Sequence, residues 1–252
     1  MKSNQCSKRQ LVNHFQQQSI ITIGDFRNYF KKQQPTVKDN VIRGRIHDLK
    51  ESGLIQSAGR GKYTFQPKEP YQPLLSEQLK KIAAIIQQYF EIDYCLSSTE
   101  WLGEFSLHQA FQHIILLEVE KEFLSDVFDL LRTEGEKEIY LNPNNHVFSL
   151  YVLSADAPII LKPLPSRAPF KAISAIKVSS LEKVLVDLFI DSQTFYAYQG
   201  QEMVYVFEKA IQLYQIDYTR LFSYAERRKK GAVLRQFLKR NIINCPKSLL
   251  ND

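Results

Sequence analysis

The sequence predicts a protein of mixed α and β structure in two domains: a winged helix-turn-helix over residues 1–67 and an α/β domain over residues 74–252 that ends in helices. Three observations predict this fold. Three prolines fall between residues 66 and 73, three helical patterns and a hairpin precede them, and alternating strand and helix patterns follow them. Because proline fixes its own φ and restricts the residue before it, residues 68–73 are expected to form an extended linker.

The first domain shows helical spacing of apolar residues three times. Phe15 marks the first helix and Phe26 the second, for which Thr22 is a suitable N-cap. The third helix is expected to open at Pro35, and one face of it carries Ile42, Ile46 and Leu49. Two short strands follow at residues 54–58 and 62–65, joined by a turn at residues 59–61.

The outer face of the third helix carries the residues expected to read DNA. At 100° per residue, Asn40, His47 and Val37 lie opposite the apolar stripe, and Gly44 leaves room for close approach to a groove. Asn pairs with adenine and Arg with guanine in the major groove, whereas cations in the hairpin turn suit phosphates or the minor groove. The expected DNA contacts are Lys38, Asn40, Arg43, Arg45, His47, Arg60 and Lys62.

Charge is distributed unevenly along the chain. Residues 1–67 contain 12 lysines and arginines and 4 acidic residues, a net charge of +8. Residues 68–219 have a net charge of −9 and residues 220–252 one of +7. Two basic ends around an acidic middle favour a polyanion as partner for at least one end. A protein-docking module remains an alternative role for the first domain.

The second domain is expected to alternate strands and helices and then turn helical. A mixed or mostly parallel sheet would contain strands at residues 93–97, 113–119, 137–141, 147–153 and 158–162. Helices are expected at residues 122–132, at a capping box formed by Ser179 and Glu182, and at residues 201–214, 218–229 and 232–240.

Several segments together resemble the AbiEi-type antitoxins of type IV toxin–antitoxin systems, which act in abortive infection and phage defence. Residues 36–63 resemble the winged helix of that family, with Arg45-Ile46-His47-Asp48-Leu49 and Gly59-Arg60-Gly61-Lys62-Tyr63. Residues 179–187 resemble its helix of the form P-E-K/R-T-L-x-D, although Ser180 stands where many members have proline. Residues 221–228 resemble its L-x-x-Y-A-x-R helix, and residues 162–169 a segment of one branch.

The resemblance implies a transcriptional autoregulator that binds double-stranded DNA at its own operator through the first domain. It also implies that the second domain neutralises a nucleotidyltransferase-like toxin, without requiring direct binding between the two proteins. We therefore expect a cytoplasmic protein that is not an enzyme and that needs no cofactor or metal.

A second site is expected where cations gather in the second domain. Lys162 and Arg167 lie in and after a predicted strand, and ligands of α/β folds tend to bind at strand ends. Arg227 and Arg228 belong to a basic helix end. Either pair is also consistent with an ordinary solvated surface.

The main alternative is a nuclease-like or nucleic-acid-processing enzyme. Glu118 and Glu120 end an apolar strand, but Lys121 follows Glu120 directly and so should point to the opposite face. No Gly-Ser pair and no Asp-x-Asp motif of a nucleotidyltransferase occurs. The three cysteines and the histidines show no metal-ligand spacing, and no apolar run reaches the roughly 18 residues of a membrane span.

Overall fold

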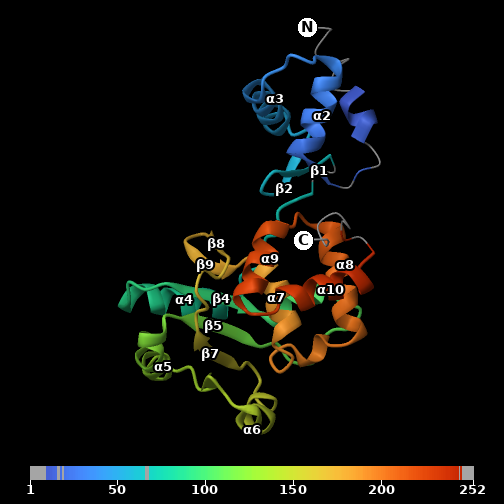
Figure 1. Ribbon diagram of the computed structural model, residues 1–252. Helices are drawn as coiled ribbons and strands as arrows, with labels where there is room; N and C mark the ends of the chain where they lie inside the picture. Colours follow the sequence, from blue (N-terminus) through green and yellow to red (C-terminus); the bar gives the residue numbers. More distant parts are fainter. Residues whose placement is uncertain (1–9, 16–17, 19, 66–67, 244, 246–252) are drawn as a thin grey trace.

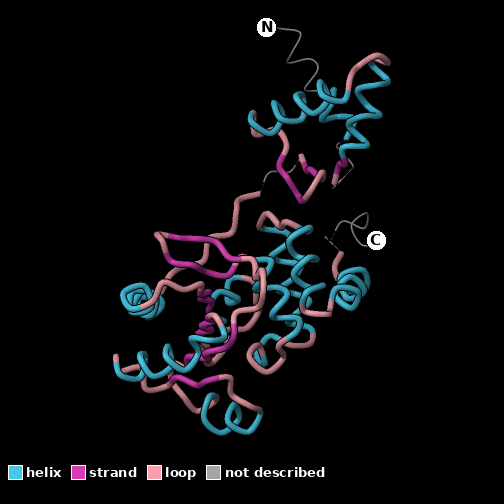
Figure 2. The backbone as a smooth tube through the Cα atoms, turned by 60° about the vertical axis from the view of Figure 1, so that its left-hand side comes forward, coloured by secondary structure: helices cyan, strands magenta, loops and turns pink. Residues whose placement is uncertain are grey.

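The computed structural model describes residues 10–15, 18, 20–65, 68–243 and 245. A smaller N-terminal part stands on one end of a larger body in both views (Figure 1 and Figure 2). Each contains its own hydrophobic core, although Ile20 and Ala58 of the N-terminal part pack with the larger core. The protein therefore has the mixed α and β structure that the sequence predicts. Within the described residues, no helix is both long enough and apolar enough to cross a membrane.

The N-terminal part consists of helices followed by a hairpin. Residues 10–15 are helical, and the elements that follow are β1 (Ile21–Thr22), α2 (Ile23–Gln33), α3 (Asp39–Glu51), β2 (Gln56–Gly59) and β3 (Lys62–Thr64). The three strands form an antiparallel sheet in the order β1-β3-β2. Thr22 caps α2 as predicted, because its hydroxyl accepts the Asp25 N–H while the Asp25 carboxylate accepts the Thr22 N–H.

Helix α3 begins later than the sequence suggested. Pro35 and Thr36 precede it, Lys38 is its N-cap and Asp39 is its first residue. Val37 is therefore outside the helix, and it is buried rather than on the outer face where it was expected. The predicted apolar face of the helix is confirmed, since Ile42, Ile46 and Leu49 are all buried.

The larger body begins with helices and strands that alternate. These elements are α4 (Glu77–Tyr89), β4 (Tyr94–Ser98), β5 (Ile115–Val119), α5 (Leu124–Thr133), β6 (Ile139–Leu141), α6 (Asn145–Val147), a π-helical turn (Phe148–Val152), β7 (Ile159–Pro163), β8 (Phe170–Ile173) and β9 (Ile176–Ser179). The chain then continues with α7 (Leu181–Ile190), α8 (Gln201–Leu213), α9 (Tyr218–Arg227) and α10 (Gly231–Asn241).

The strands of this body form one mixed sheet of six strands in the order β6-β7-β5-β4-β9-β8. Strand β7 pairs in parallel with β5 and β6, and β4 pairs in parallel with β9. The β4–β5 and β8–β9 pairs are antiparallel. Helices α4 and α5 lie on one side of the sheet and α7 to α10 on the other (Figure 1). The core lies between these layers.

The segment at residues 147–153 corrects one prediction. We expected a strand, but these residues form the end of α6 and the π-helical turn. Asn144 caps α6 by accepting the Val147 N–H, and the buried residues Phe148 and Val152 are four apart, which is helical spacing. Neither α4 nor the β8–β9 hairpin was predicted from the sequence, although Ser76 caps α4 and Leu79, Ile82 and Ile86 follow at helical spacing.

Candidate functional site

The outer face of α3 presents polar side chains to solvent beside a groove. Asn40, Arg43 and His47 are exposed, as predicted, and so is Gly44. A groove of about 180 Å³ separates this helix from β3, and it is lined by Ile23, Arg43, Ile46, His47, Lys50 and Tyr63. The exposed side chains of α3 thus lie beside a concave surface that has three basic side chains, those of Arg43, His47 and Lys50.

Two other residues of the predicted DNA-contact set hold different positions. Lys38 is exposed just before the first turn of α3. Arg45 is partly buried, because its guanidinium lies 5.0 Å from the centre of the Phe30 ring and donates a 3.2 Å hydrogen bond to the Gln34 side chain. Arg45 therefore joins α3 to α2, while Lys38 remains accessible.

A second arginine fixes the angle between α2 and α3. Arg27 donates two hydrogen bonds to the Asp39 carboxylate, of 3.2 and 2.8 Å. The hydrogen bond from Arg27 lowers the pKa of Asp39. Asp39 also lies in the first turn of α3, where a negative charge is favourable for the helix dipole. The presentation of the outer face thus depends on a defined pair of side chains.

The hairpin β2–β3 lies against the larger body instead of extending freely into solvent. The Arg60 N–H donates to the Thr219 hydroxyl at the start of α9, at 3.0 Å. A Cβ at Gly59 would stand 2.6 Å from that hydroxyl oxygen, and Gly59 has a φ of +137°. Only glycine accommodates this backbone conformation and this close approach. The Arg60 side chain remains exposed, and Lys62 is partly buried beside α9 and α10.

Two glutamines complete the contact between the two parts. Gln56 donates to the Gln215 side chain at 2.8 Å, and Gln215 donates to the Ser57 carbonyl at 2.6 Å. The Gln56 amide also bonds both the N–H and the carbonyl of Lys68. The beginning of the predicted linker is therefore held between the hairpin and α8–α9, and Glu69 pairs with Tyr214 as a β-bridge.

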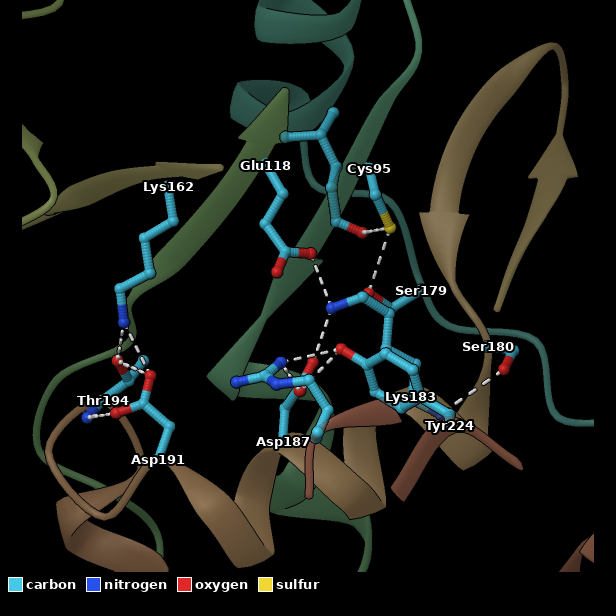
Figure 3. A network of polar contacts seen from close by, with 12 residues as sticks. Cys95, Glu118, Lys162, Ser179, Ser180, Lys183, Asp187, Asp191, Thr194 and Tyr224 are labelled. Atoms are coloured by element: carbon cyan, nitrogen blue, oxygen red, sulfur yellow. Dashed lines mark hydrogen bonds and ion pairs between the residues drawn. The ribbon is translucent and has the colours of Figure 1, made fainter. Parts of the chain in front are cut away.

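A polar row crosses three strands of the large sheet and meets a polar stripe on α7. Cys95, Glu118 and Lys162 are directly opposite one another on β4, β5 and β7, so their side chains share one face of the sheet. The stripe consists of polar residues four apart along and beside α7: Ser179, Lys183, Asp187 and Asp191. Figure 3 shows each member of the row facing a member of the stripe.

The three facing pairs differ in charge. The Cys95 sulfur lies 3.2 Å from the Ser179 hydroxyl. The Lys183 ammonium is 2.5 Å from the Glu118 carboxylate. Lys162 donates to Asp191 at 2.6 Å and to Thr194 at 3.0 Å. The row and the stripe therefore match sulfur with hydroxyl and cation with anion.

Lys183 is at the centre of a buried ion network (Figure 3). Its side chain is 1% exposed and contacts Asp187 as well as Glu118, each at 2.5 Å. Asp187 also accepts hydrogen bonds of 2.9 Å from the Tyr224 hydroxyl and from Arg228, both of α9 or its C-cap. This network joins the sheet, α7 and α9: Lys183 and Glu118 are buried within it, and Asp187 and Arg228 are partly exposed at its edge.

The pKa shifts follow from this burial. Burial lowers the pKa of Lys183, but the Asp187 and Glu118 carboxylates outweigh it and hold that pKa well above its ordinary value. Burial raises the pKa of Glu118 against the opposing effect of Lys183, and it raises the pKa of the Cys95 thiol to about 12. A thiol with so high a pKa is a poor nucleophile at neutral pH.

The predicted second-site residues are not gathered in one place. Lys162 is engaged by Asp191, whereas Arg167 is exposed in the turn after β7 with a φ of +54°. Arg227 is exposed on α9, whereas Arg228 turns inward to Asp187. Of the four cations, Arg167 and Arg227 are thus the ones fully presented to solvent.

The two glutamates considered as catalytic residues of a nuclease-like enzyme both hold contacts within the fold. Glu118 faces Lys183 in the interior, and Glu120 accepts the Asp93 N–H at 2.7 Å beyond the end of β5. Lys121 starts a 3-10 turn. Among the described residues, no group of three or more histidine, cysteine, aspartate or glutamate side chains is arranged to hold a metal ion.

We did not predict the ion network around Lys183 from the sequence, although the sequence contains a signal for it. Lys183 and Asp187 are charged residues one turn apart in α7, whose other residues apart from Glu182 are apolar. Charged residues at such positions are rarely buried unless they are paired. The expected capping box also differs, because Ser180 is the N-cap and Glu182 instead accepts the Asp217 N–H before α9.

Comparison with known proteins identifies a family but no characterised relative. No curated protein matches this chain. Residues 41–244 match a family of unknown function, DUF6577. The match begins within α3 and includes the hairpin, the ion network and α9, so the matched range covers most of the features described above. Since it spans well over half of the sequence, the chain belongs to the DUF6577 family.

Proposed function

We propose that this chain is a DNA-binding transcriptional regulator whose N-terminal part acts as a winged helix, with α3 as the recognition helix. The observation that carries the proposal is the outer face of α3, where Asn40, Arg43 and His47 are exposed around Gly44. A helix docked by one apolar face and presenting amide, guanidinium and imidazole groups on the other has the chemistry of major-groove readout.

Charge supports the same proposal. The +8 net charge of residues 1–67 would attract a duplex and release counterions on binding. In the proposed complex, Asn40 and Arg43 contact base edges, and Lys38 and Arg60 contact phosphates. Arg45 supports α3 through Phe30 and contributes little directly, because its guanidinium is already engaged.

The proposed regulatory target is the operator of its own operon, and the proposed role of the larger body is that of an antitoxin against a nucleotidyltransferase-like toxin. This part rests on the resemblance to AbiEi-type antitoxins. Residues from two of the resembling segments, Lys183 and Asp187 on one side and Tyr224 on the other, meet in the ion network. We propose that the protein acts in the cytoplasm without enzymatic activity of its own.

DNA binding is tested with the full chain and a duplex taken from directly upstream of its gene, against a scrambled duplex of equal length. We expect the N40A/R43A variant to lose preference for the upstream duplex. We also expect each lost bidentate contact to reduce discrimination by about 1–3 kcal/mol. The matched control is K121A/K137A, which also removes polar surface groups but on the larger body. Unchanged preference in N40A/R43A would refute α3 as the reading helix.

The antitoxin role is tested separately by growth. The product of the adjacent gene is induced alone, with the wild-type chain, and with the N40A/R43A chain. We expect toxicity in the first case and rescue in both others, because the exposed face of α3 is remote from the ion network. An adjacent product without toxicity, or no rescue by the wild-type chain, would refute the antitoxin role and leave the DNA-binding proposal standing.

A further inference from the structure

Val41 is an apolar side chain that the fold leaves in solvent. It belongs to the first turn of α3, and 44% of its surface is exposed. Among the described residues up to Phe65, no other large apolar side chain is so exposed. The buried residues Ile42 and Ile46 define the apolar face of α3, and Val41 lies outside that face. Its exposure is therefore not explained by packing of the helix.

The exposed side of α3 divides into two rows of residues. At about 100° per residue, one row consists of Asn40, Arg43 and His47, and the other of Val41, Gly44 and Asp48. The first row borders the groove beside β3, because Arg43 and His47 line that groove. The second row, to which Val41 belongs, contains no cation.

Gly44 and Asp48 determine what can approach Val41. A Cβ at Gly44 would meet no other atom within 4 Å, so the backbone beside Val41 is open to a close approach. The Asp48 carboxylate is exposed, and its negative charge repels phosphate groups. Within a duplex, the edge of a base therefore suits this row better than the sugar-phosphate backbone does.

The Asn40 amide is fixed next to Val41. The Val41 N–H donates to Asn40 Oδ1 at 2.9 Å and to the Lys38 carbonyl at 3.0 Å. In the proposed complex, this first turn of α3 enters the major groove, where the N-terminal residues of a recognition helix contact base edges. The turn then presents an amide group and an isopropyl group side by side.

Thymine has the matching surface in the major groove. It is the base that carries a methyl group there, beside its O4 acceptor, and apolar side chains contact that methyl group. Contact between the methyl group and a valine removes apolar surface of both from water, which stabilises the complex. Because neither group is charged, the contact releases no counterions and does not add to the salt dependence of binding.

We propose that Val41 is a specificity-determining residue that contacts the C5-methyl group of a thymine in the duplex that α3 reads. The inference deepens the proposed function and rests on it for the docking of α3 in the major groove. It gives the two rows different tasks: the row of Arg43 makes polar contacts, and Val41 selects a T·A pair. Val41 thus adds sequence discrimination without adding affinity for arbitrary DNA.

The test combines a protein variant with the removal of single methyl groups from the DNA. In the duplex from directly upstream of the gene, each thymine is replaced in turn by uracil, which keeps every hydrogen-bonding group and lacks only the C5-methyl group. Affinities of the full-length wild type, Val41→Ala and the matched control Val233→Ala are measured by fluorescence anisotropy. Val233 is also an exposed valine within a helix, on α10, with 52% of its surface in solvent. Alanine is a better helix former than valine, so both variants keep their helices.

We expect uracil at the contacted position to weaken binding to the wild type by about fourfold, the factor that one buried carbon of this size contributes. The same replacement should not affect Val41→Ala, because the side chain that contacts the methyl group is absent. Val41→Ala should itself bind the unmodified upstream duplex about fourfold more weakly than the wild type. Its salt slope and its affinity for the scrambled duplex should not change, because no phosphate contact is lost. Val233→Ala should match the wild type on every duplex.

Several results would overturn the contact. If uracil weakens the wild type at no position, or weakens the wild type and Val41→Ala equally, Val41 reads no thymine methyl group. Equal weakening of the upstream and scrambled duplexes in Val41→Ala would give Val41 a general role in α3 instead. Wild-type affinity of Val41→Ala for every duplex would leave Val41 to a protein partner.

The proposed function is judged separately in the same experiment. If the wild type prefers the upstream duplex and N40A/R43A loses that preference, DNA reading by α3 stands even where the contact of Val41 fails. A wild type without any preference for the upstream duplex would refute both.

Discussion

Helices α3 and α7 both carry charges of either sign beside an apolar face, yet they use these charges in opposite ways. In α3 the side chains of Asn40, Arg43 and His47 are in solvent. In α7 the charges of Lys183 and Asp187 are enclosed and paired with each other, with the sheet and with α9. The comparison shows which charged side chains are available to bind a partner and which ones are already paired within the fold.

The ion network offers the largest expected effect. Replacing Lys183 with methionine would leave Glu118 buried without its cation, whereas Asp187 would keep Arg228 as a partner. Breaking a buried ion pair in this way typically costs about 3–5 kcal/mol of the free energy of unfolding. Urea unfolding of the full chain measures it. The double variant K183M/E118Q should recover part of the loss because it also removes the uncompensated carboxylate. If K183M were as stable as the wild type, the charges of α7 would contribute as little to folding as the exposed charges of α3.

The same lysine predicts a loss of stability at alkaline pH. A lysine whose pKa is higher in the folded than in the unfolded state contributes stability that is complete below the unfolded value of 10.5. That contribution disappears as the pH rises through the folded-state pKa. Urea midpoints measured from pH 8 to pH 11.5 (on the order of one unit beyond the lysine value) should fall more steeply at the upper end in wild type than in K183M. Parallel curves would contradict the prediction.

The contact between the two parts provides a test of intermediate size. Gly59→Ala combines a φ of +137° with a collision against the Thr219 hydroxyl. We expect a loss of about 1–3 kcal/mol, the usual cost of such backbone strain, and faster hydrogen exchange at the Arg60 amide. Gly44→Ala is the matched control, since a Cβ there meets no atom within 4 Å, and it should stabilise α3 by about 1 kcal/mol. Equal effects of the two substitutions would show that the hairpin is not held by this contact.

The smallest effect is expected on the outer face of α3. Removing Asn40 and Arg43 side chains should change the free energy of unfolding by less than about 0.5 kcal/mol, because exposed groups without partners in the core contribute little. Thermal unfolding of N40A/R43A beside the wild type checks it. A large destabilisation would mean that these residues serve the fold rather than a ligand.

Local periodicity predicted much of the fold. The buried face of α3, the four C-terminal helices and most strands of the large sheet follow from spacing of apolar residues and from caps, as the Thr22 cap illustrates. The stretch at residues 147–153 misled us because its apolar residues are so dense that helix and strand periods both fit them.

Long-range pairing accounts for the rest. Glu118 and Lys183 are brought together only by the packing of α7 on the sheet. Nothing in the sequence around either residue indicates that the other is its partner. The docking of the hairpin on α9 is similarly set by residues far apart, such as Gln56 and Gln215. The exposed cations Arg43 and Arg60 were placed correctly on the surface, but the sequence did not reveal that Arg60 sits against the larger body.

The Arg60–Thr219 contact also has a consequence for synthesis on the ribosome. The two residues are 159 positions apart, so the hairpin leaves the exit tunnel long before its docking surface exists. At about 5–20 residues per second, the outer face of the nascent hairpin waits on the order of 10–30 s for α9. During that interval Ala58 and the Gln56 amide lack their contacts with the larger body. This exposed face of the hairpin is where we expect a co-translational chaperone to bind.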